Sequence, residues 1–346
     1  MKITKLLFMA FASAMLFVSC SNDASDSSDI PLGIYDKGVL IVNEGNGAAG
    51  SISYLNNDFA TIRQDIFGTE NPGQGIGGYV QSIFFDGNRA FIISNGSNKI
   101  TVVNRYTFAF IAKIETGFKV PRYGVVVNGK AYVTNLNTFN SLTDDFISVI
   151  DLSSLQVETS IPVTAIAEKI IAENGKLYVA NGTYGEGSSI KIIDIATKSI
   201  VSSIDVGISP NSMEMENGFL YVLCANYVDD SKLVKINTAT NQKVSEITMT
   251  GLVNAQNLNI ENNTLYFTVN SAVFRENLSS ATISSTPLFS STATTLYGFN
   301  VNNNRIFVSD AKNYASDGEV FIYTTAGILQ KQFSVGLNPN GFYFND

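Results

Sequence analysis

The sequence predicts an all-β protein, a seven-bladed β-propeller with four antiparallel strands in each blade and with the N- and C-terminal strands sharing one blade. Three observations predict this fold. A short strand ending in Asn or Asp recurs seven times after residue 37. A tight Asn- or Gly-containing turn precedes most copies, and no stretch beyond the N-terminal leader has the period of an amphipathic helix.

The recurring strand sets the length of a blade. Its copies cover residues 39–43, 90–95, 131–135, 177–181, 220–226, 265–270 and 306–310. Six copies share an aromatic position that returns after 41, 46, 43, 45 and 41 residues, at Phe91, Tyr132, Tyr178, Tyr221, Tyr266 and Phe307. Such spacings are typical of four-stranded blades of roughly 40 to 50 residues. A two-layer sandwich does not explain seven similar periods.

The other strands of a blade are placed around this repeat. Asn-Gly and Asp-Gly pairs favour two-residue turns that match strand twist, so each predicts a hairpin between a first and a second strand. The pairs are Asp86-Gly87, Asn128-Gly129, Asn174-Gly175 and Asn217-Gly218, with Asn262-Asn263 and Asn303-Asn304 in the same place. A variable loop then leads to third strands such as 147–151 and 190–194, and to fourth strands such as 199–204.

The two ends of the chain predict closure of the ring. Residues 339–344 resemble a first strand with no second strand after it, whereas the body begins at a second strand, 39–43. Joining the two in one blade leaves no open sheet edge.

The N-terminus predicts export and lipid anchoring. Residues 1–19 form a lipoprotein signal peptide, in which two lysines precede an apolar run too short to span a bilayer. Leu16-Phe17-Val18-Ser19-Cys20 resembles a bacterial lipobox, although Phe17 replaces the usual Leu. This pattern makes Cys20 the lipidation site, and several acyl chains would give a durable anchor. An ordinary secretory signal with a coincidental Cys is the alternative.

The segment after Cys20 predicts a tether and an address. Residues 20–36 begin with Ser, Asn, Ala and Asp, which cannot pack, so we expect a flexible acidic tether before the propeller at 37–346. The expected location is the cell envelope, as an outer-membrane lipoprotein. An acidic stretch after the lipidated Cys points to the outer face, and a plain solvated linker is the alternative.

The composition excludes several classes of function. The formal net charge of −8 disfavours nucleic acid as a partner, because an acidic surface repels phosphates. The chain has no His, which removes Ser-His-Asp catalysis and His-ligated zinc or haem. Cys224 follows an apolar run and is expected to be an inert core thiol. We therefore expect no enzyme activity, no cofactor and no metal.

The loops between second and third strands are long and varied, whereas the hairpins on the opposite face are short, so function is expected on the loop face. Aligning the blades on their hairpin turns gives a ring at the channel mouth. Its members are Val80, Arg122, Glu168, Asn211, Gln256, Tyr297 and Asn340. All but Val80 are polar and are candidate ligand contacts. The alternative is that they only solvate the mouth, as any propeller requires.

Aromatic residues in the same loops are further candidates. Phe139, Tyr184, Tyr227 and Tyr314 could give a ligand flat apolar area, although exposed loop tyrosines are also common without function. The Asn residues that end the second strands recur in nearly every blade, which indicates a structural role in bonding loop backbone. The segment with Asp310, Asn313, Asp317 and Glu319 is rich in oxygen ligands, but its spacing is wrong for an EF-hand and favours a solvated turn.

One repeat resembles a known family. Tyr132-Val133-Thr134-Asn135 is the signature of the YVTN-repeat (YncE-like) propellers, and Lys176 to Gly207 is similar to a full repeat of that type. The resemblance covers residues 38–346 and is weakest around 273–288. It implies the propeller fold. It also implies similarity to the surface lipoproteins that capture cobalamin for TonB-dependent transporters, although no ligand motif carries over.

These observations lead to three functional hypotheses. The first is a lipid-anchored envelope protein that captures a small-molecule nutrient, cobalamin or another, for a TonB-dependent transporter. The second is a scaffold that holds another envelope protein on its loop face. The third, a hydrolase or lyase, fits worst because no nucleophile and base pair is found and Glu168 is the one acid in the ring.

Overall fold

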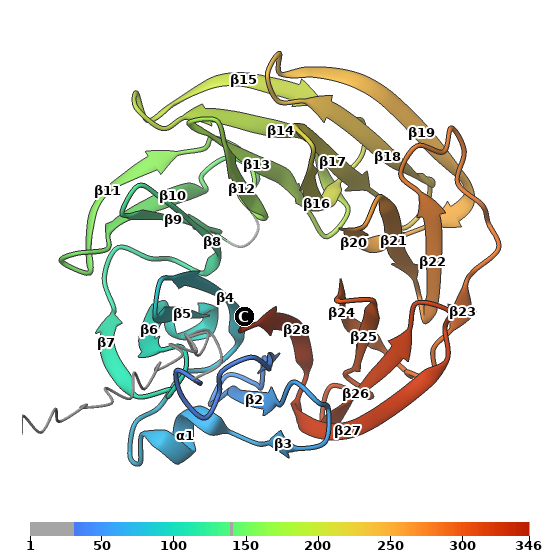
Figure 1. The fold of residues 1–346 in the computed structure, drawn as a ribbon. Helices are drawn as coiled ribbons and strands as arrows, with labels where there is room; N and C mark the ends of the chain where they lie inside the picture. The colour runs from blue at the N-terminus through green and yellow to red at the C-terminus, as the bar shows by residue number, and fades with distance from the viewer. Residues whose placement is uncertain (1–30, 139–140, 346) are drawn as a thin grey trace, which may run out of the picture. The chain divides into compact units, whose positions relative to one another are not determined.

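The computed structural model describes residues 31–138 and 141–345; the predicted signal peptide, Cys20 and Phe139 lie outside this part of the chain. The described residues form seven four-stranded antiparallel sheets. The sheets are the blades of a propeller arranged around a central axis (Figure 1). This confirms the predicted fold class.

We number the blades 1–7 in chain order. Blade 1 contains β28 (Pro339–Phe344), β1 (Val39–Asn43), β2 (Ser51–Leu55) and β3 (Ile62–Arg63). Blade 2 contains β4 (Val80–Asp86), β5 (Arg89–Ser94), β6 (Lys99–Asn104) and β7 (Phe110–Ile114). Blade 3 contains β8 (Pro121–Val127), β9 (Lys130–Asn135), β10 (Phe146–Asp151) and β11 (Gln156–Pro162). Blade 4 contains β12 (Ile170–Glu173), β13 (Lys176–Thr183), β14 (Glu186–Asp194) and β15 (Ser199–Asp205).

The remaining blades have the same strand order from the axis outward. Blade 5 contains β16 (Pro210–Glu216), β17 (Phe219–Cys224), β18 (Asp230–Asn237) and β19 (Gln242–Val253). Blade 6 contains β20 (Gln256–Glu261), β21 (Thr264–Val269), β22 (Ala272–Asn277) and the two-residue β23 (Phe289–Ser290). Blade 7 contains β24 (Leu296–Asn302), β25 (Arg305–Asp310), β26 (Asp317–Thr324) and β27 (Leu329–Leu337).

The hairpins between first and second strands follow the predicted turns, with one shift. Asn128 and Gly129 have φ values of 49° and 75°, which suit a turn with two positive φ angles. Asn-Asn fills the same role in blades 6 and 7, because Asn tolerates this conformation better than most residues. In blade 2, Asp86 pairs with Arg89, so the loop is Gly87-Asn88, one residue later than predicted.

Burial within a blade is greatest in the second strand and lowest in the outermost strand. The second strand β1 is buried at every residue, because neighbouring blades cover both of its faces. The outermost strand β11 instead alternates exposed and partly buried residues. Because the second strands are the most buried, they are the most uniformly apolar, and this is why their repeat could be recognised in the sequence.

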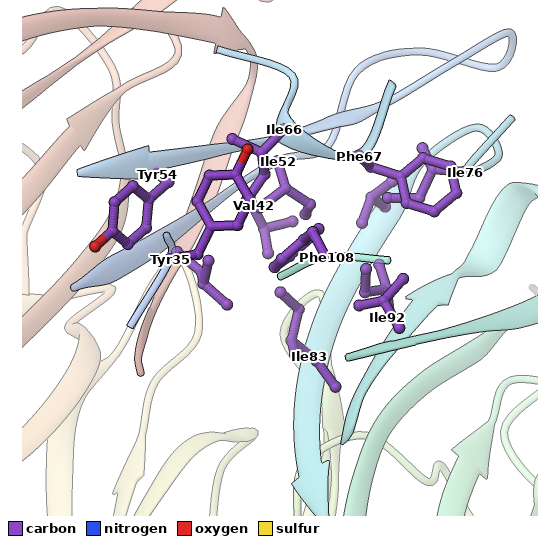
Figure 2. Packing of buried hydrophobic residues seen from close by; sticks show 14 residues of the cluster. Tyr35, Val42, Ile52, Tyr54, Ile66, Phe67, Ile76, Ile83, Ile92 and Phe108 are labelled. Carbon is purple, nitrogen blue, oxygen red and sulfur yellow. The ribbon is translucent and has the colours of Figure 1, made fainter. Parts of the chain in front are cut away.

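A helix contributes to the core between blades 1 and 2. The helix α1 (Ile66–Glu70) begins after Asp65, whose side chain accepts the Gly68 N–H. Figure 2 shows its two buried side chains packed against residues of both blades. The cluster includes Val42, Ile52, Ile66, Phe67, Ile83, Ile92 and Phe108. Each such fully buried side chain stabilises the fold by about 1.5–3 kcal/mol.

Two of the Asn residues that end second strands, Asn135 and Asn181, hold loop backbone in place, as predicted. Asn135 Nδ2 donates to the Ser148 hydroxyl of the third strand, at 3.0 Å, while its Oδ1 accepts the Lys119 N–H from the incoming loop, also at 3.0 Å. Asn181 repeats this arrangement with Ser189. One amide therefore ties a second strand, a third strand and the entry loop together.

The closing strand β28 pairs antiparallel with β1, as predicted from the two ends. Asn345, just after it, is fully buried. Its Nδ2 donates to the carbonyls of Tyr35, at 2.5 Å, and Arg105, at 2.8 Å. Its Oδ1 accepts from Arg105 Nε at 2.6 Å. Since Arg105 belongs to the loop after β6, this side chain joins blade 1 to blade 2.

Two further residues show where the core extends. Tyr35 lies within the predicted tether, yet it is 1% exposed and stacks edge-on against Tyr54 and Phe108, so the ordered body includes it. Cys224 is fully buried, which raises the pKa of its thiol and confirms the expected inert core thiol. Within residues 31–138 and 141–345, no helix is long and apolar enough to cross a membrane.

We expect Asn345→Ala to lower the free energy of unfolding by about 2–4 kcal/mol, because it leaves two buried carbonyls without a donor at the joint between blades 1 and 2. Chemical denaturation would measure this loss. Asn57→Ala, at an exposed loop residue, is the matched control and should change stability by less than about 0.5 kcal/mol. Equal unfolding midpoints for the two variants would contradict the role assigned to Asn345.

Candidate functional site

The innermost strands are irregular where they begin at the channel mouth. The pairing of first and second strands shifts register by a β-bulge in blades 1, 2, 3, 5, 6 and 7. In blade 4, Glu168 N and Lys169 O both bond to Ala180 just before β12. A bulge interrupts the regular alternation of side chains and can re-aim one of them. The ring side chains lie at these bulges.

The bulges correct one member of the predicted ring. Val80 is fully buried in the core between blades 1 and 2 and does not reach the mouth. Gln81 takes its place, because the blade 2 hairpin lies one residue later than the alignment assumed. In blade 6 the bulge falls nearer the hairpin, so both Gln256 and Asn257 line the mouth.

A cavity of about 730 Å³ opens at the mouth on the loop face, and we call it the mouth pocket. It brings together every predicted ligand contact that the structure describes. These are Arg122, Glu168, Asn211, Gln256, Tyr297, Asn340, Tyr184, Tyr227 and Tyr314. Phe139 lies outside the described residues. The sequence missed other lining residues, among them Glu44, Gln81, Tyr123, Lys169, Asn254, Asn257 and Asn270.

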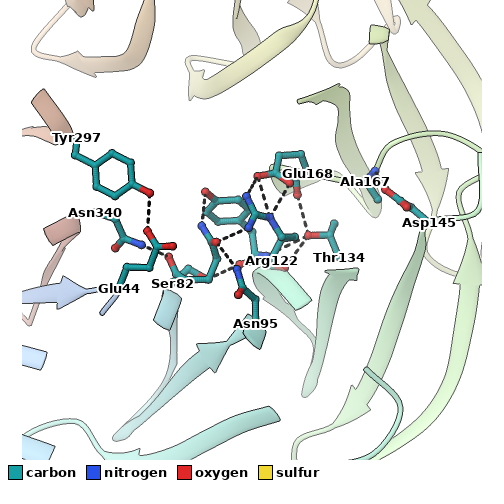
Figure 3. Close-up of polar contacts among 12 residues, drawn as sticks. Glu44, Ser82, Asn95, Arg122, Thr134, Asp145, Ala167, Glu168, Tyr297 and Asn340 are labelled. Carbon is teal, nitrogen blue, oxygen red and sulfur yellow. Dashed lines mark hydrogen bonds and ion pairs between the residues drawn. The ribbon is translucent and has the colours of Figure 1, made fainter. Parts of the chain in front are cut away.

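A buried ion pair anchors one side of the mouth pocket (Figure 3). Arg122 Nη2 lies 2.6 Å from Glu168 Oε1, and Arg122 Nε donates to Oε2 at 2.9 Å. The two side chains are only 11% and 9% exposed. Burial alone would lower the pKa of Arg122, but Glu168 raises it above its ordinary value. Arg122 therefore stays charged and holds the Glu168 side chain in place.

Neighbouring side chains extend this pair into a network. Arg122 Nη1 also donates to Gln81 Oε1, which accepts a second bond from Asn95 Nδ2 at 2.8 Å. Gln81 Nε2 donates to the Tyr123 hydroxyl at 3.0 Å. Blades 2, 3 and 4 thus share one hydrogen-bonded network, which holds this part of the mouth rigid.

A second acid, Glu44, lies in the mouth pocket beside this network (Figure 3). The Tyr297 hydroxyl donates to Glu44 Oε2 at 2.5 Å, and the Tyr314 ring stands edge-on to Tyr297 at 5.5 Å. Burial raises the pKa of Glu44, whereas the bond from Tyr297 and the charge of Arg122 lower it. Burial and Glu44 both raise the pKa of Tyr297, so the phenol stays protonated.

Three tyrosines form an exposed rim around the mouth pocket. Tyr184, Tyr227 and Tyr314 are 59%, 62% and 52% exposed. All three lie in loops between second and third strands, on the face predicted for function. Each can offer flat apolar area together with a hydroxyl group to a ligand at the mouth.

A smaller cavity of about 210 Å³ adjoins the mouth pocket, and we call it the inner chamber. Lys169, Asn211, Gln256 and Asn257 line both. Glu214 of β16 lines the inner chamber but not the mouth pocket. Burial, which outweighs the opposing charge of Lys169, raises the pKa of its carboxyl to about 7. No sequence motif pointed to Glu214, because one acid in a strand carries no pattern.

The oxygen-rich segment of blade 7 is occupied by turn contacts. The Asp310 carboxylate accepts the backbone N–H groups of Thr294, Thr295 and Lys312. Asn313 Oδ1 likewise accepts two backbone N–H groups of its own turn. The side-chain oxygens of Asp310 and Asn313 therefore bond loop backbone, in agreement with the predicted turn. Among the described residues no three His, Cys, Asp or Glu side chains group as metal ligands do.

The fold and the mouth pocket together define a seven-bladed β-propeller with a polar cavity on its loop face. The chain belongs to the family described as Domain of unknown function (DUF5074), whose model matches residues 37–339. No curated protein matches the sequence.

Solved structures share the fold at low identity. The computationally designed Ika8 protein has a TM-score of 0.60 at 12% identity, over 91% of this chain and 92% of that chain. Hydrazine synthase of Kuenenia stuttgartiensis has a TM-score of 0.60 at 16% identity, over 74% and 86%. BamB from Moraxella catarrhalis has a TM-score of 0.53 at 15% identity, over 88% and 85%. Such likenesses show the propeller fold alone.

We expect Arg122→Met to cost about 3 kcal/mol of stability, because it leaves the Glu168 carboxylate buried without its cation. Adding Glu168→Gln should recover at least half of the loss. A double-mutant cycle by chemical denaturation measures the coupling. Lys243→Met, which breaks an exposed pair with Glu246, is the control and should cost less than about 1 kcal/mol. If Arg122→Met lowers the free energy of unfolding no more than Lys243→Met does, the buried ion pair does not stabilise this side of the mouth pocket.

Proposed function

We propose that this protein is a non-catalytic binding protein that captures a polar small molecule in the mouth pocket. The observation that carries this proposal is the convergence of the described candidate residues in one cavity of about 730 Å³. A concave site with convergent polar groups and an aromatic rim is the usual setting for a small ligand.

The distribution of charge supports a largely uncharged ligand. Arg122 is paired with Glu168, and Glu44 accepts the Tyr297 hydroxyl, so these charges are engaged within the protein. Apart from Lys169, the rest of the lining is mainly amide and hydroxyl. It includes Asn211, Asn254, Gln256, Asn257, Thr268, Asn270, Ser271, Thr294 and Thr295. Such groups suit a ligand edged with amides or hydroxyls, and the rim tyrosines suit a flat apolar face.

The finer proposal is a lipid-anchored nutrient-capture protein of the cell envelope. The lipobox-like segment ending in Cys20 and the YVTN-like repeat support it. A corrinoid is a flat ring edged with amide side chains, which matches the amide lining and the tyrosine rim. In this proposal cobalamin, or another nutrient of similar chemistry, is delivered to a TonB-dependent transporter.

The absence of catalysis is part of the proposal. The carboxylate of Glu168, the one acid in the predicted ring, is held by Arg122 and is poorly placed to take a proton. Turnover that is abolished by Glu168→Gln would overturn this part.

Calorimetry with cyanocobalamin tests the finer proposal. We expect binding at micromolar concentrations, with Tyr184→Ala and Tyr227→Ala each weakening it about tenfold, because each removes an exposed ring from the rim. Val244→Ala, at an exposed residue of the outermost strand β19, should leave the affinity unchanged. The absence of heat would exclude cobalamin, and equal affinities in all variants would place its site elsewhere.

A protein partner is the second candidate, because Val228 is 81% exposed beside Tyr227 at the same rim. Mild crosslinking of intact envelopes followed by purification should then recover one partner with the wild-type chain. Val228→Asp should reduce that yield, since it places a charge in an apolar contact. Recovery of the chain alone would count against the scaffold.

A further inference from the structure

The inner chamber lies between strands of three blades. Its walls come from β16, β20 and β24, together with Lys169 just before β12. Its volume of about 210 Å³ corresponds to about seven water molecules at about 30 Å³ each, which is the space of a small organic molecule. Because it shares four lining residues with the mouth pocket, a ligand can reach it from the loop face.

The chamber contains one carboxylate without a hydrogen-bond partner. Within the described residues no donor lies within hydrogen-bond distance of the Glu214 carboxylate. Every other lining side chain contributed by β16, β20 and β24 is uncharged. The nearest charges that act on Glu214 are Lys169 and, on its own strand, Glu216. A partly buried carboxylate in this condition favours a cationic group within the chamber.

The chamber also contains one cation without a carboxylate partner. The Lys169 ammonium lies 3.8 Å from the centre of the Tyr123 ring. In the described part of the chain, no carboxylate oxygen lies within 4.0 Å of it, Glu214 included. Stacking on an aromatic face leaves its N–H donors available for an anion.

We propose that the inner chamber binds a small zwitterion of the α-amino acid class, with its ammonium on Glu214 and its carboxylate on Lys169. A simple cation would satisfy Glu214 but would be repelled by Lys169, and a simple anion would meet the reverse. A zwitterion satisfies both charges at once and adds no net charge to the chamber.

The amides of the chamber complete this site. Asn259 Oδ1 accepts the Val301 N–H at 3.2 Å, which leaves its Nδ2 group available. No hydrogen bond within the described residues engages the Asn300 side chain, which also lines the chamber. These amides can bond the carboxylate or the side chain of a bound amino acid.

The titration of Glu214 agrees with this assignment. Burial raises the pKa of its carboxyl to about 7, so part of the population is protonated near neutral pH. A bound ammonium favours the charged form, so binding should release a proton and tighten as pH rises through 7. Lys169 and Glu216 are the charged groups that face Glu214, and β20 and β24 contribute neutral side chains.

Calorimetry on the full chain with glycine, L-alanine and L-serine tests the proposal. We expect these zwitterions to bind, and ethylamine and propionate, which each lack one charge, to bind at least about tenfold more weakly. Affinity should fall as the pH is lowered from 8 to 6. No heat from any zwitterion at millimolar concentrations, or equal binding of ethylamine or propionate, would overturn the proposal.

Two variants and two matched controls locate the site. Glu214→Gln and Lys169→Met should each weaken L-alanine binding about tenfold or more, and Glu214→Gln should remove the pH dependence. Glu115→Gln and Lys331→Met, at exposed residues, should leave it unchanged. Thermal unfolding confirms that each variant folds. Unchanged affinity in both chamber variants would overturn the proposal.

This proposal rests on the proposed function only for access through the mouth pocket, and the two can fail separately. The zwitterion titration requires no ligand at the rim tyrosines. If L-alanine binds but no ligand binds at the mouth pocket, the chamber proposal stands and the proposed capture function is overturned. If a ligand binds at the mouth pocket but L-alanine does not bind, the capture function stands and the chamber proposal is overturned.

Discussion

The pairing of β28 with β1 is the interaction on which the rest of the molecule depends. It joins the two ends of the described chain in blade 1 and supplies the innermost strand of that blade, so blade 1 has four strands like the others. The closing strand also carries a ring residue. Asn340 Nδ2 donates to the Val80 carbonyl of blade 2 at 3.1 Å and lines the mouth pocket. Because every blade except blade 4 supplies a bulged ring residue and blade 4 supplies Glu168, the pocket has its shape only when the ring is closed.

The fold could be predicted because its signals are local. Each blade has its own local sequence pattern, a two-residue turn such as Asn128-Gly129 followed by an apolar second strand, and the pattern is repeated along the chain. The β-bulges could not be predicted in the same way, because they depend on how a first strand meets its partner. A bulge shifts the strand register by only one residue, but it changes which side chain lines the mouth pocket. Gln81 rather than Val80 reaches the mouth after a shift of one residue, which moves a side chain from the core to the pocket.

The sequence predicted which residues lie in the candidate site, but not which of their side chains contact one another. Arg122 and Glu168 are 46 residues apart, one repeat, so they occupy neighbouring places in the ring and have opposite charges. That signal was present in the sequence. Glu44 and Tyr297 are 253 residues apart, and only ring closure brings blade 7 next to blade 1. Glu214 had no signal at all, since the environment that raises its pKa comes from three blades at once.

These pairings divide the mouth into two halves with different physical properties. Blades 2, 3 and 4 share a closed network in which Arg122, Gln81 and Glu168 satisfy one another, so this half is rigid, and it presents Lys169 and the rim residue Tyr184 of blade 4 to a ligand. Blades 5, 6 and 7 supply amides and the chamber carboxylate, several of which have no partner within the described residues. A partly buried polar group without a protein partner can gain a hydrogen bond or an ion pair from a ligand. Selectivity should therefore reside in blades 5 to 7 together with Lys169 and Tyr184 of blade 4, while the network of blades 2 to 4 fixes the distance across which a ligand must fit.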